Sequence, residues 1–156
     1  MTEREQAIEF LQSQNILTLA TVAEGELPSA TPLFYLLHGG ICLYWVSSAS
    51  SLHSRNLVRG REVAAAVYAA TDRWKKIHGV QMRGSVHIIT DSQERKEVLR
   101  SYAERFHLGR VLRVAMSQSM LYKLVPSWIR LIDNSRRFGY NYEFKLYADD
   151  EASGEK

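Results

Sequence analysis

The chain has 156 residues, of which 46% are hydrophobic, and it carries a formal charge of +3 at pH 7. This length suits one domain, and the single Cys42 excludes both an internal disulfide and a cysteine-based metal cluster. No apolar run reaches the length of a membrane span, and the acidic start MTEREQ lacks the features of a signal peptide, so we expect a cytoplasmic protein.

The first predicted elements are a helix and a three-stranded meander. Thr2 and Glu5 have the spacing of a capping box for a helix over residues 3–14, with Ile8 and Leu11 on its inner face. The hydrophobic period then changes to two, which predicts antiparallel strands joined by short turns. The strands cover residues 16–23, 27–37 and 41–46, and the turns cover residues 24–26 and 38–40.

The rest of the chain continues the β pattern around further helices. A short helix over residues 51–59 is ended by Gly60, and a longer helix over residues 91–107 begins with a capping box of Thr90 and Gln93. The remaining predicted elements are strands over residues 63–69, 77–89, 120–132 and 138–147, and a helical segment over residues 110–116. Six or seven antiparallel strands with peripheral helices predict a mainly β protein, a small β-barrel.

Charge is distributed unevenly between one predicted domain, residues 1–147, and a predicted acidic disordered tail, residues 148–156. The tail has four acids and one base, so the domain carries a charge of +6. Basic residues gather between His53 and Lys76, which suits a small anionic ligand, although a solvated rim explains the same cluster. Few aromatic residues interleave with these bases, which disfavours a nucleic-acid module.

The most distinctive motif is a serine-rich turn, where a strand leads into the predicted short helix. Several hydroxyls lie beside the N–H groups of a helix N-terminus, and the helix dipole favours an anion there. His53 follows the expected N-cap by two residues, and a bound phosphate would raise its pKa. Ordinary capping serines and a surface histidine would produce the same pattern. The hydroxyls belong to Ser47, Ser48, Ser50 and Ser51.

The sequence identifies neither a catalytic nucleophile nor a metal site. No serine, cysteine or threonine lies in a context that supplies an oriented base. The five histidines lack HxxxH and HExxH spacing, and Cys42 reads as a small buried hydrophobe. Catalytic residues are therefore not assigned.

Four blocks carry a resemblance to a known family. They are ATPLFYLL (30–37), LYWVSSASSLHSRNL (43–57), IHGVQMRG (77–84) and IRLIDNSRRFGYNYEFKL (129–146). Together, and in this order, they resemble the pyridoxamine 5'-phosphate oxidase-like FMN-binding split-barrel superfamily, and within it a small bacterial branch. The resemblance extends from Ile16 to Leu146 and implies a split β-barrel.

The resemblance also implies a homodimer in which FMN lies in a groove between the subunits, so that each site takes residues from both chains. The second strand would lie along the flavin, and the serine-rich turn would hold its phosphate. Gln81 shares a strand face with the ring-contacting position of the family, and residues 134–138 would reach the partner's flavin. The implied cofactor-binding residues are Thr31, Pro32, Leu33, Phe34, Tyr35, Leu36, Val46, Ser47, Ser51, Leu52, His53, Gln81, Asn134 and Phe138.

This chain departs from the founding oxidases at the phosphate end of the flavin. Those oxidases carry arginine where Thr31 stands, and Arg-Lys where Leu52 and His53 stand, so the fixed positive charge on the phosphate is reduced here. Their C-terminal arginine and tryptophan pattern for pyridoxine phosphate is also missing, so pyridoxamine oxidase activity is not carried over. The bases that could replace the missing charge are Arg55, Arg59, Arg73 and Lys76.

By this resemblance the protein is expected to be an FMN-dependent oxidoreductase of unknown substrate, in which the flavin carries out the redox chemistry. Three alternatives stay open at this point. The protein could be a non-catalytic flavin carrier or sensor, or a split barrel that uses haem or a deazaflavin. Whether the protein is an enzyme is therefore not decided by the sequence.

Overall fold

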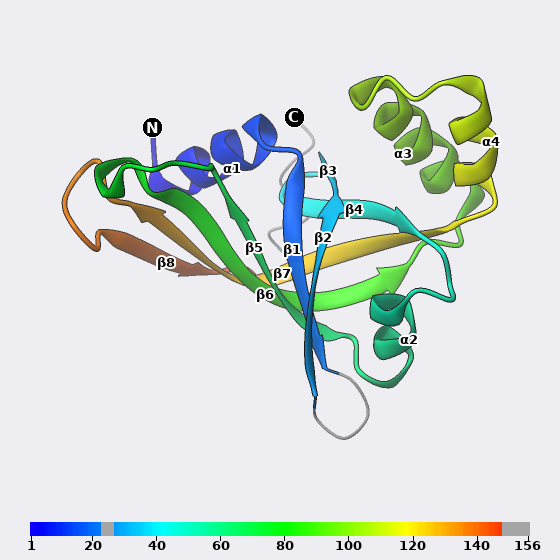
Figure 1. Cartoon of the computed structure of the whole chain (residues 1–156), viewed down its shortest axis with the longest axis horizontal. Coiled ribbons are helices and arrows are strands. Elements are labelled where there is room, and N and C mark those ends of the chain that lie inside the picture. The colour runs from blue at the N-terminus through cyan, green and yellow to red at the C-terminus, as the bar shows by residue number, and fades with distance from the viewer. Residues whose placement is uncertain (23–26, 148–156) are drawn as a thin grey trace.

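A computed structural model describes residues 1–22 and 27–147 of the chain. These residues form a curled antiparallel sheet of eight strands, with helices at its ends and on one side (Figure 1). The predicted fold class, a mainly β split barrel with peripheral helices, is confirmed. The predicted turn at residues 24–26 and the predicted tail at residues 148–156 lie outside the described residues.

Six or seven strands were expected, and the predicted strand over residues 27–37 is in fact two, because it is interrupted at Tyr35. The strands are β1 (Ile16–Val22), β2 (Pro28–Phe34), β3 (Leu36–His38), β4 (Cys42–Ser47), β5 (Glu62–Tyr68), β6 (His78–Ile88), β7 (Met120–Asp133) and β8 (Asn141–Lys145). The helices are α1 (Glu3–Ser13), α2 (Leu52–Arg59), α3 (Ser92–Arg105) and α4 (Arg110–Ser117), with a short 3-10 helix η2 (Trp74–Lys76).

The sheet curls because its two edge strands are consecutive in the chain. The strand order is β2-β1-β5-β6-β7-β4-β3, with β8 added beside β7. Only Tyr35 separates β2 from β3, so the two edges of the sheet must come together there. The Tyr35 side chain is buried, and its hydroxyl donates to the carbonyl oxygen of Leu11 at 2.6 Å. Closure of this kind protects strand edges that would otherwise pair with other chains.

The long strand β7 produces the split in the barrel. Its first half pairs with β4 and its second half pairs with β8, while β6 runs along both halves. Between the halves, the register of β6 against β7 shifts at Arg83 and Gly84. A Cβ atom on Gly84 would lie 2.1 Å from the carbonyl oxygen of Val125, so only glycine fits this bulge.

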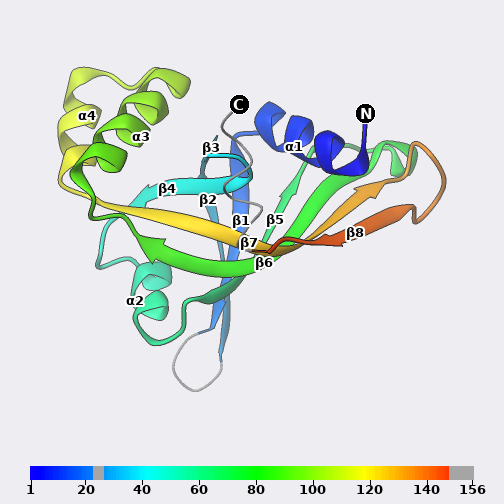
Figure 2. The ribbon, with the colours of Figure 1, turned by 180° about the vertical axis from the view of Figure 1, so that it is seen from behind.

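Helices close the ends of the barrel, whose inner face holds the apolar core. The helix α1 lies over one opening and buries Ala7, Phe10 and Leu11, and α2 lies at the opposite end of the sheet (Figures 1 and 2). The capping box of Thr2 and Glu5 on α1 is confirmed. Within the described part of the chain, no helix is both long enough and apolar enough to cross a membrane.

The predicted N-cap of α3 is wrong by one residue. The carboxylate of Asp91, not the hydroxyl of Thr90, accepts a hydrogen bond from the N–H of Glu94 at 2.8 Å. Asp91 offers a charged oxygen at the same end of the helix, and a carboxylate there also interacts favourably with the helix dipole.

Candidate functional site

The serine-rich turn forms a hydroxyl network around a buried histidine. His53 is only 7% exposed, so the alternative of a surface histidine is wrong. Its Nε2 lies 2.7 Å from Oγ of Ser47 and 3.2 Å from Oγ of Ser51. Oγ of Ser51 lies a further 2.7 Å from Oγ of Ser54. Three hydroxyls and one imidazole from the end of β4 and the start of α2 therefore lie together.

The start of α2 is left open to another acceptor. Ser51 is the N-cap residue, but its side chain makes no capping hydrogen bond, and its hydroxyl donates to the carbonyl oxygen of Ser48 at 2.8 Å. The first-turn N–H groups are therefore not satisfied by the cap, and they are the groups that bind anions at helix N-termini. The guanidinium of Arg55 donates to the carbonyl oxygen of Ser50 at 3.0 Å, which adds a fixed positive charge.

Burial sets the protonation state of His53. It lowers the pKa of His53 below the usual histidine value, because the charged imidazolium loses solvation. The imidazole is thus neutral near pH 7, and Nε2 can donate or accept according to its tautomer. An anion at the start of α2 would oppose this effect and favour the protonated form.

The proposed replacement bases are spread over the molecule. Arg55 lies on α2 itself, whereas Arg73 and Lys76 belong to the β5–β6 connection, at the opposite end of the molecule from α2 (Figures 1 and 2). Arg59 ends α2, and its side chain lies outside the described part of the structure. Of these four basic residues, Arg55 is therefore the one whose described side chain lies at the turn of the same chain.

The outer face of the sheet carries a second group of candidate residues. Directly paired residues of antiparallel strands point to the same face, so cross-strand pairs line up in rows. One row contains Pro32, Thr18, Ala66, Gln81, Arg130 and Glu143. The next row contains Ala30, Ala20, Ala64, Arg83, Trp128 and Lys145.

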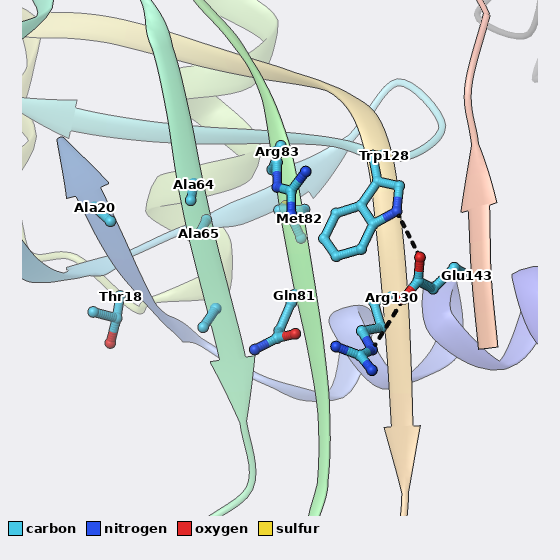
Figure 3. Close-up of a pocket in the computed structure, with 11 residues that line it drawn as sticks. Thr18, Ala20, Ala64, Ala65, Gln81, Met82, Arg83, Trp128, Arg130 and Glu143 are labelled. Atoms are coloured by element: carbon cyan, nitrogen blue, oxygen red, sulfur yellow. Dashed lines mark hydrogen bonds and ion pairs between the residues drawn. The ribbon is translucent and has the colours of Figure 1, made fainter. Parts of the chain in front are cut away.

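These rows surround a cavity of about 400 Å³, the sheet-face cavity (Figure 3). Its volume falls in the range of small-molecule sites. Of the predicted cofactor-binding residues, Gln81 lies in its lining. The other described lining residues are Thr18, Ala20, Ala64, Ala65, Ala66, Met82, Arg83, Trp128, Arg130 and Glu143.

The predicted residues of β2 face in two directions. Thr31 and Leu33 pair with core residues of β1 and are half-buried on the inner face, while Pro32 and Phe34 are exposed on the outer face. Tyr35 is a core residue whose hydroxyl donates a hydrogen bond to the carbonyl oxygen of Leu11 on α1. The remaining two apolar candidates near these strands, Leu36 and Val46, pack against a core cluster on the α3 side, and Leu52 is exposed.

Asn134 and Phe138 lie in the β7–β8 connection and have different roles there. Asn134 is buried, its Nδ2 donates to the carbonyl oxygen of Trp74 at 3.0 Å, and its Oδ1 accepts from the N–H of Gly139 at 3.1 Å. These bonds join the β7–β8 connection to the β5–β6 connection. Phe138 is 76% exposed beside Trp74, so it remains available to contact another molecule.

One chain holds the predicted residues in three separate places. Ser47, Ser51 and His53 are brought together at α2. Pro32 and Gln81 share a row of the sheet but are three strand spacings apart, about 14 Å. The β7–β8 connection, with Phe138, lies on the opposite side of the molecule from α2 (Figures 1 and 2).

Most residues that line the sheet-face cavity were not among the predicted site residues. Arg83 follows Gln81 by two residues on β6, so the two side chains point to the same face of the sheet. Trp128 and Glu143 could not be found in this way, because their position depends on how β7 pairs with β6 and β8. No cluster of three metal-ligating side chains occurs in residues 1–22 and 27–147.

Comparison with known proteins relates this chain to one protein family. Residues 4–133 match the family described as Pyridoxamine 5'-phosphate oxidase. A UPF0306 protein of Serratia proteamaculans is 23% identical over 137 residues, which cover 88% of this chain and 91% of that protein.

Two solved structures illustrate the structural likeness. A conserved hypothetical protein of Mycobacterium tuberculosis has a TM-score of 0.75 at 22% identity, and the matched region covers 96% of this chain and 94% of that protein. A haem binding protein of Mycobacterium smegmatis has a TM-score of 0.74 at 19% identity, with coverage of 93% of this chain but only 58% of its own. At such identities the likeness concerns the fold alone.

Proposed function

This chain belongs to the pyridoxamine 5'-phosphate oxidase family, because residues 4–133 match that family, and we propose that it binds FMN through the serine-rich turn. In this proposal it acts as an FMN-dependent oxidoreductase on a small molecule. The observation that carries the proposal is the uncapped start of α2 beside a buried His53. Bound FMN would supply hydride or electron transfer, and the protein would position and tune the ring.

The donors of the turn fit a phosphate group. The open N–H groups of α2 and the hydroxyls of Ser47 and Ser51 can donate to phosphate oxygens, and Arg55 lies in the same turn. A phosphate monoester carries close to two negative charges at pH 7, whereas Arg55 supplies one fixed positive charge. Protonation of His53 would supply a second, so the residues present can match the charge of FMN when His53 takes up a proton.

The proposal includes a homodimer with the flavin between two copies of the chain. The predicted residues lie in three places that one chain holds apart, and a groove between two copies could bring the turn of one chain to the sheet face or the Phe138 loop of the other. Pro32, Leu33 and Val46 would then accompany the flavin beside the turn, and Phe138 would approach it from the partner. Light scattering of the FMN-loaded protein tests this arrangement, and a loaded monomer would contradict it.

The phosphate assignment is tested by replacing the turn residues. Ser51→Ala with His53→Ala removes two groups that would contact the phosphate, so the dissociation constant for FMN, measured by quenching of flavin fluorescence, should rise at least about tenfold. The chain offers a matched control, because Ser85 and His87 form a similar pair at 3.1 Å on β6. Ser85→Ala with His87→Ala should leave FMN affinity unchanged, and equal effects of the two double variants would remove the turn from the site.

The cofactor class is tested by the absorbance spectrum of the purified protein. Flavin bands and a co-purifying mass of FMN would support the proposal, whereas a Soret band would overturn it in favour of haem. The described residues lining the sheet-face cavity include no histidine, cysteine or tyrosine to ligate haem iron, and the likeness to the haem binding protein covers only 58% of that chain. Reduction of the bound flavin by NADH or NADPH with turnover would distinguish an enzyme from a flavin carrier.

A further inference from the structure

Arg95 joins the helix α3 to the point where α4 ends and β7 begins. Its Nη2 donates to the carbonyl oxygen of Ser117 at 2.9 Å and to that of Ser119 at 2.7 Å. Ser117 is the last residue of α4, and β7 begins at Met120. The last carbonyls of a helix have no partner within the helix, and a cation there also interacts favourably with the helix dipole. Arg95 therefore fixes the connection that leads from α4 into β7.

The start of β7 lies beside the serine-rich turn. Met120 pairs with Ser47, the last residue of β4, and the chain then leaves β4 for the turn before α2 (Figure 1). Among the described strands, β3 pairs with β4 only as far as Tyr44, so β7 alone holds Ser47 in the sheet. The hydroxyl oxygen of Ser47 lies 2.7 Å from Nε2 of His53. The position of this hydroxyl therefore depends on the first residue of β7.

The residue before Arg95 on α3 holds the same two strands further from the turn. Oε1 of Glu94 accepts a hydrogen bond from the hydroxyl of Tyr44 at 2.8 Å and lies 3.8 Å from Nζ of Lys123. Tyr44 and Lys123 pair directly across β4 and β7, on the side of the ladder away from the turn. Contacts from α3 thus reach this ladder at two points, and of these two the contact of Arg95 is the one beside the pair that contains Ser47.

We propose that Arg95 is a positioning residue for the serine-rich turn. By fixing Ser119 it holds Met120 against Ser47, and so it keeps the hydroxyl of Ser47 within hydrogen-bond distance of His53. Without the guanidinium, the carbonyl of Ser119 turns to water and the last pair of the β4–β7 ladder opens. A binding group needs support of this kind, because a misplaced donor loses much of its contribution. The consequence for FMN rests on the proposed function, whereas the contact between Ser47 and His53 can be measured without any cofactor.

NMR of the cofactor-free, full-length protein tests the contact directly. The nitrogen chemical shift of Nε2 of His53 reports its hydrogen bond, so Arg95→Gln should move this signal toward that of a histidine in water. Millimolar guanidinium added to Arg95→Ala should move it back, because the added cation can donate to the same carbonyls. Arg95→Lys keeps a cation at the end of α4 and should move the signal less, and it provides a folded variant if Arg95→Gln does not fold.

Tyr44→Phe is the matched control, because it removes the other hydrogen bond between α3 and this ladder. It should lower the free energy of unfolding and leave the His53 signal in place. An unmoved His53 signal in Arg95→Gln would overturn the proposal. An equal movement in Tyr44→Phe would assign Arg95 to general stability and would also overturn it.

The same variants separate this inference from the proposed cofactor. The dissociation constant for FMN should rise at least about fivefold in Arg95→Gln and stay unchanged in Tyr44→Phe. A His53 signal that moves in Arg95→Gln supports the positioning role whatever the FMN result. Unchanged FMN affinity in both Arg95→Gln and the double variant Ser51→Ala with His53→Ala would contradict the proposed function and leave Arg95 as the residue that positions Ser47.

Discussion

Nε2 of His53 lies 2.7 Å from the hydroxyl oxygen of Ser47, so one side-chain contact joins the last residue of β4 to the first turn of α2. The contact between His53 and Ser47 is shielded from water, because His53 is only 7% exposed. A buried imidazole next to an open helix N-terminus couples proton binding to anion binding.

FMN affinity should therefore rise as the pH falls. Burial lowers the pKa of His53 in the free protein, and a bound phosphate would raise it, so binding takes up a proton. The gain should begin at the higher pKa of the complex and stop below the lower pKa of the free protein, so the pH window of the effect lies between these two pKa values. Fluorescence titrations across this window measure it.

His53→Gln is the control for this pH dependence. Glutamine keeps a hydrogen-bonding side chain but does not titrate, so the variant should retain only the pH dependence of the FMN phosphate, whose second pKa is about 6. An identical pH profile for the variant and the unaltered protein would contradict the role of His53.

The attachment of α2 to the barrel should depend on a buried hydrogen bond. Nδ2 of Asn56 donates to Oγ1 of Thr21 at 2.9 Å, and both residues are buried. Asn56→Ala leaves the threonine hydroxyl unsatisfied and should lower the free energy of unfolding by about 1 to 3 kcal/mol. Urea denaturation measures the loss.

A double-mutant cycle separates this bond from general packing. Thr21→Val removes the same acceptor, so Asn56→Ala combined with Thr21→Val should destabilise by less than the two single changes added together. Strict additivity would show that the two side chains do not stabilise each other.

The bulge between β6 and β7 should not tolerate any side chain at Gly84. A Cβ there would meet the carbonyl oxygen of Val125 at 2.1 Å and Cα of Pro126 at 2.7 Å, and both are backbone atoms. Gly84→Ala should cost more than about 3 kcal/mol in unfolding free energy or prevent folding. Gly60→Ala is the control, because Gly60 has no heavy atom within 4 Å of its Cβ position and should change stability by less than about 1 kcal/mol.

Asn134 should stabilise the connection between the two loops rather than contact a cofactor within its own chain. Asn134→Ala leaves the carbonyl of Trp74 and the N–H of Gly139 without their partner, so we expect a loss of about 1 to 3 kcal/mol. The amide of Gly139 should exchange faster with deuterated solvent, and this can be followed by NMR. Gln93→Ala, at an exposed position of α3, is the control. Unchanged exchange at Gly139 would contradict the assignment.

Local patterns predicted the elements well where one residue contacts another nearby in the chain. The capping box of Thr2 and Glu5 and the strand predicted over residues 77–89 both depend on such spacing, and both are confirmed. The interruption at Tyr35 was missed, because it arises where two sheet edges meet and where the tyrosine hydroxyl finds Leu11 on α1. The cap of α3 was misplaced by one residue because Thr90 and Asp91 are both good N-cap residues.

The order of strands and helices and the place of the serine-rich turn follow from local sequence patterns, because period, capping and turn residues act over a few positions. Long-range packing sets the burial of His53, the open start of α2 and the grouping of Arg83, Trp128 and Glu143 on one face. These features depend on the pairing of β6, β7 and β8 and on the packing of α2 against β1. Such pairing joins residues far apart in the chain, and its register is set by burial of the whole sheet rather than by any local pattern.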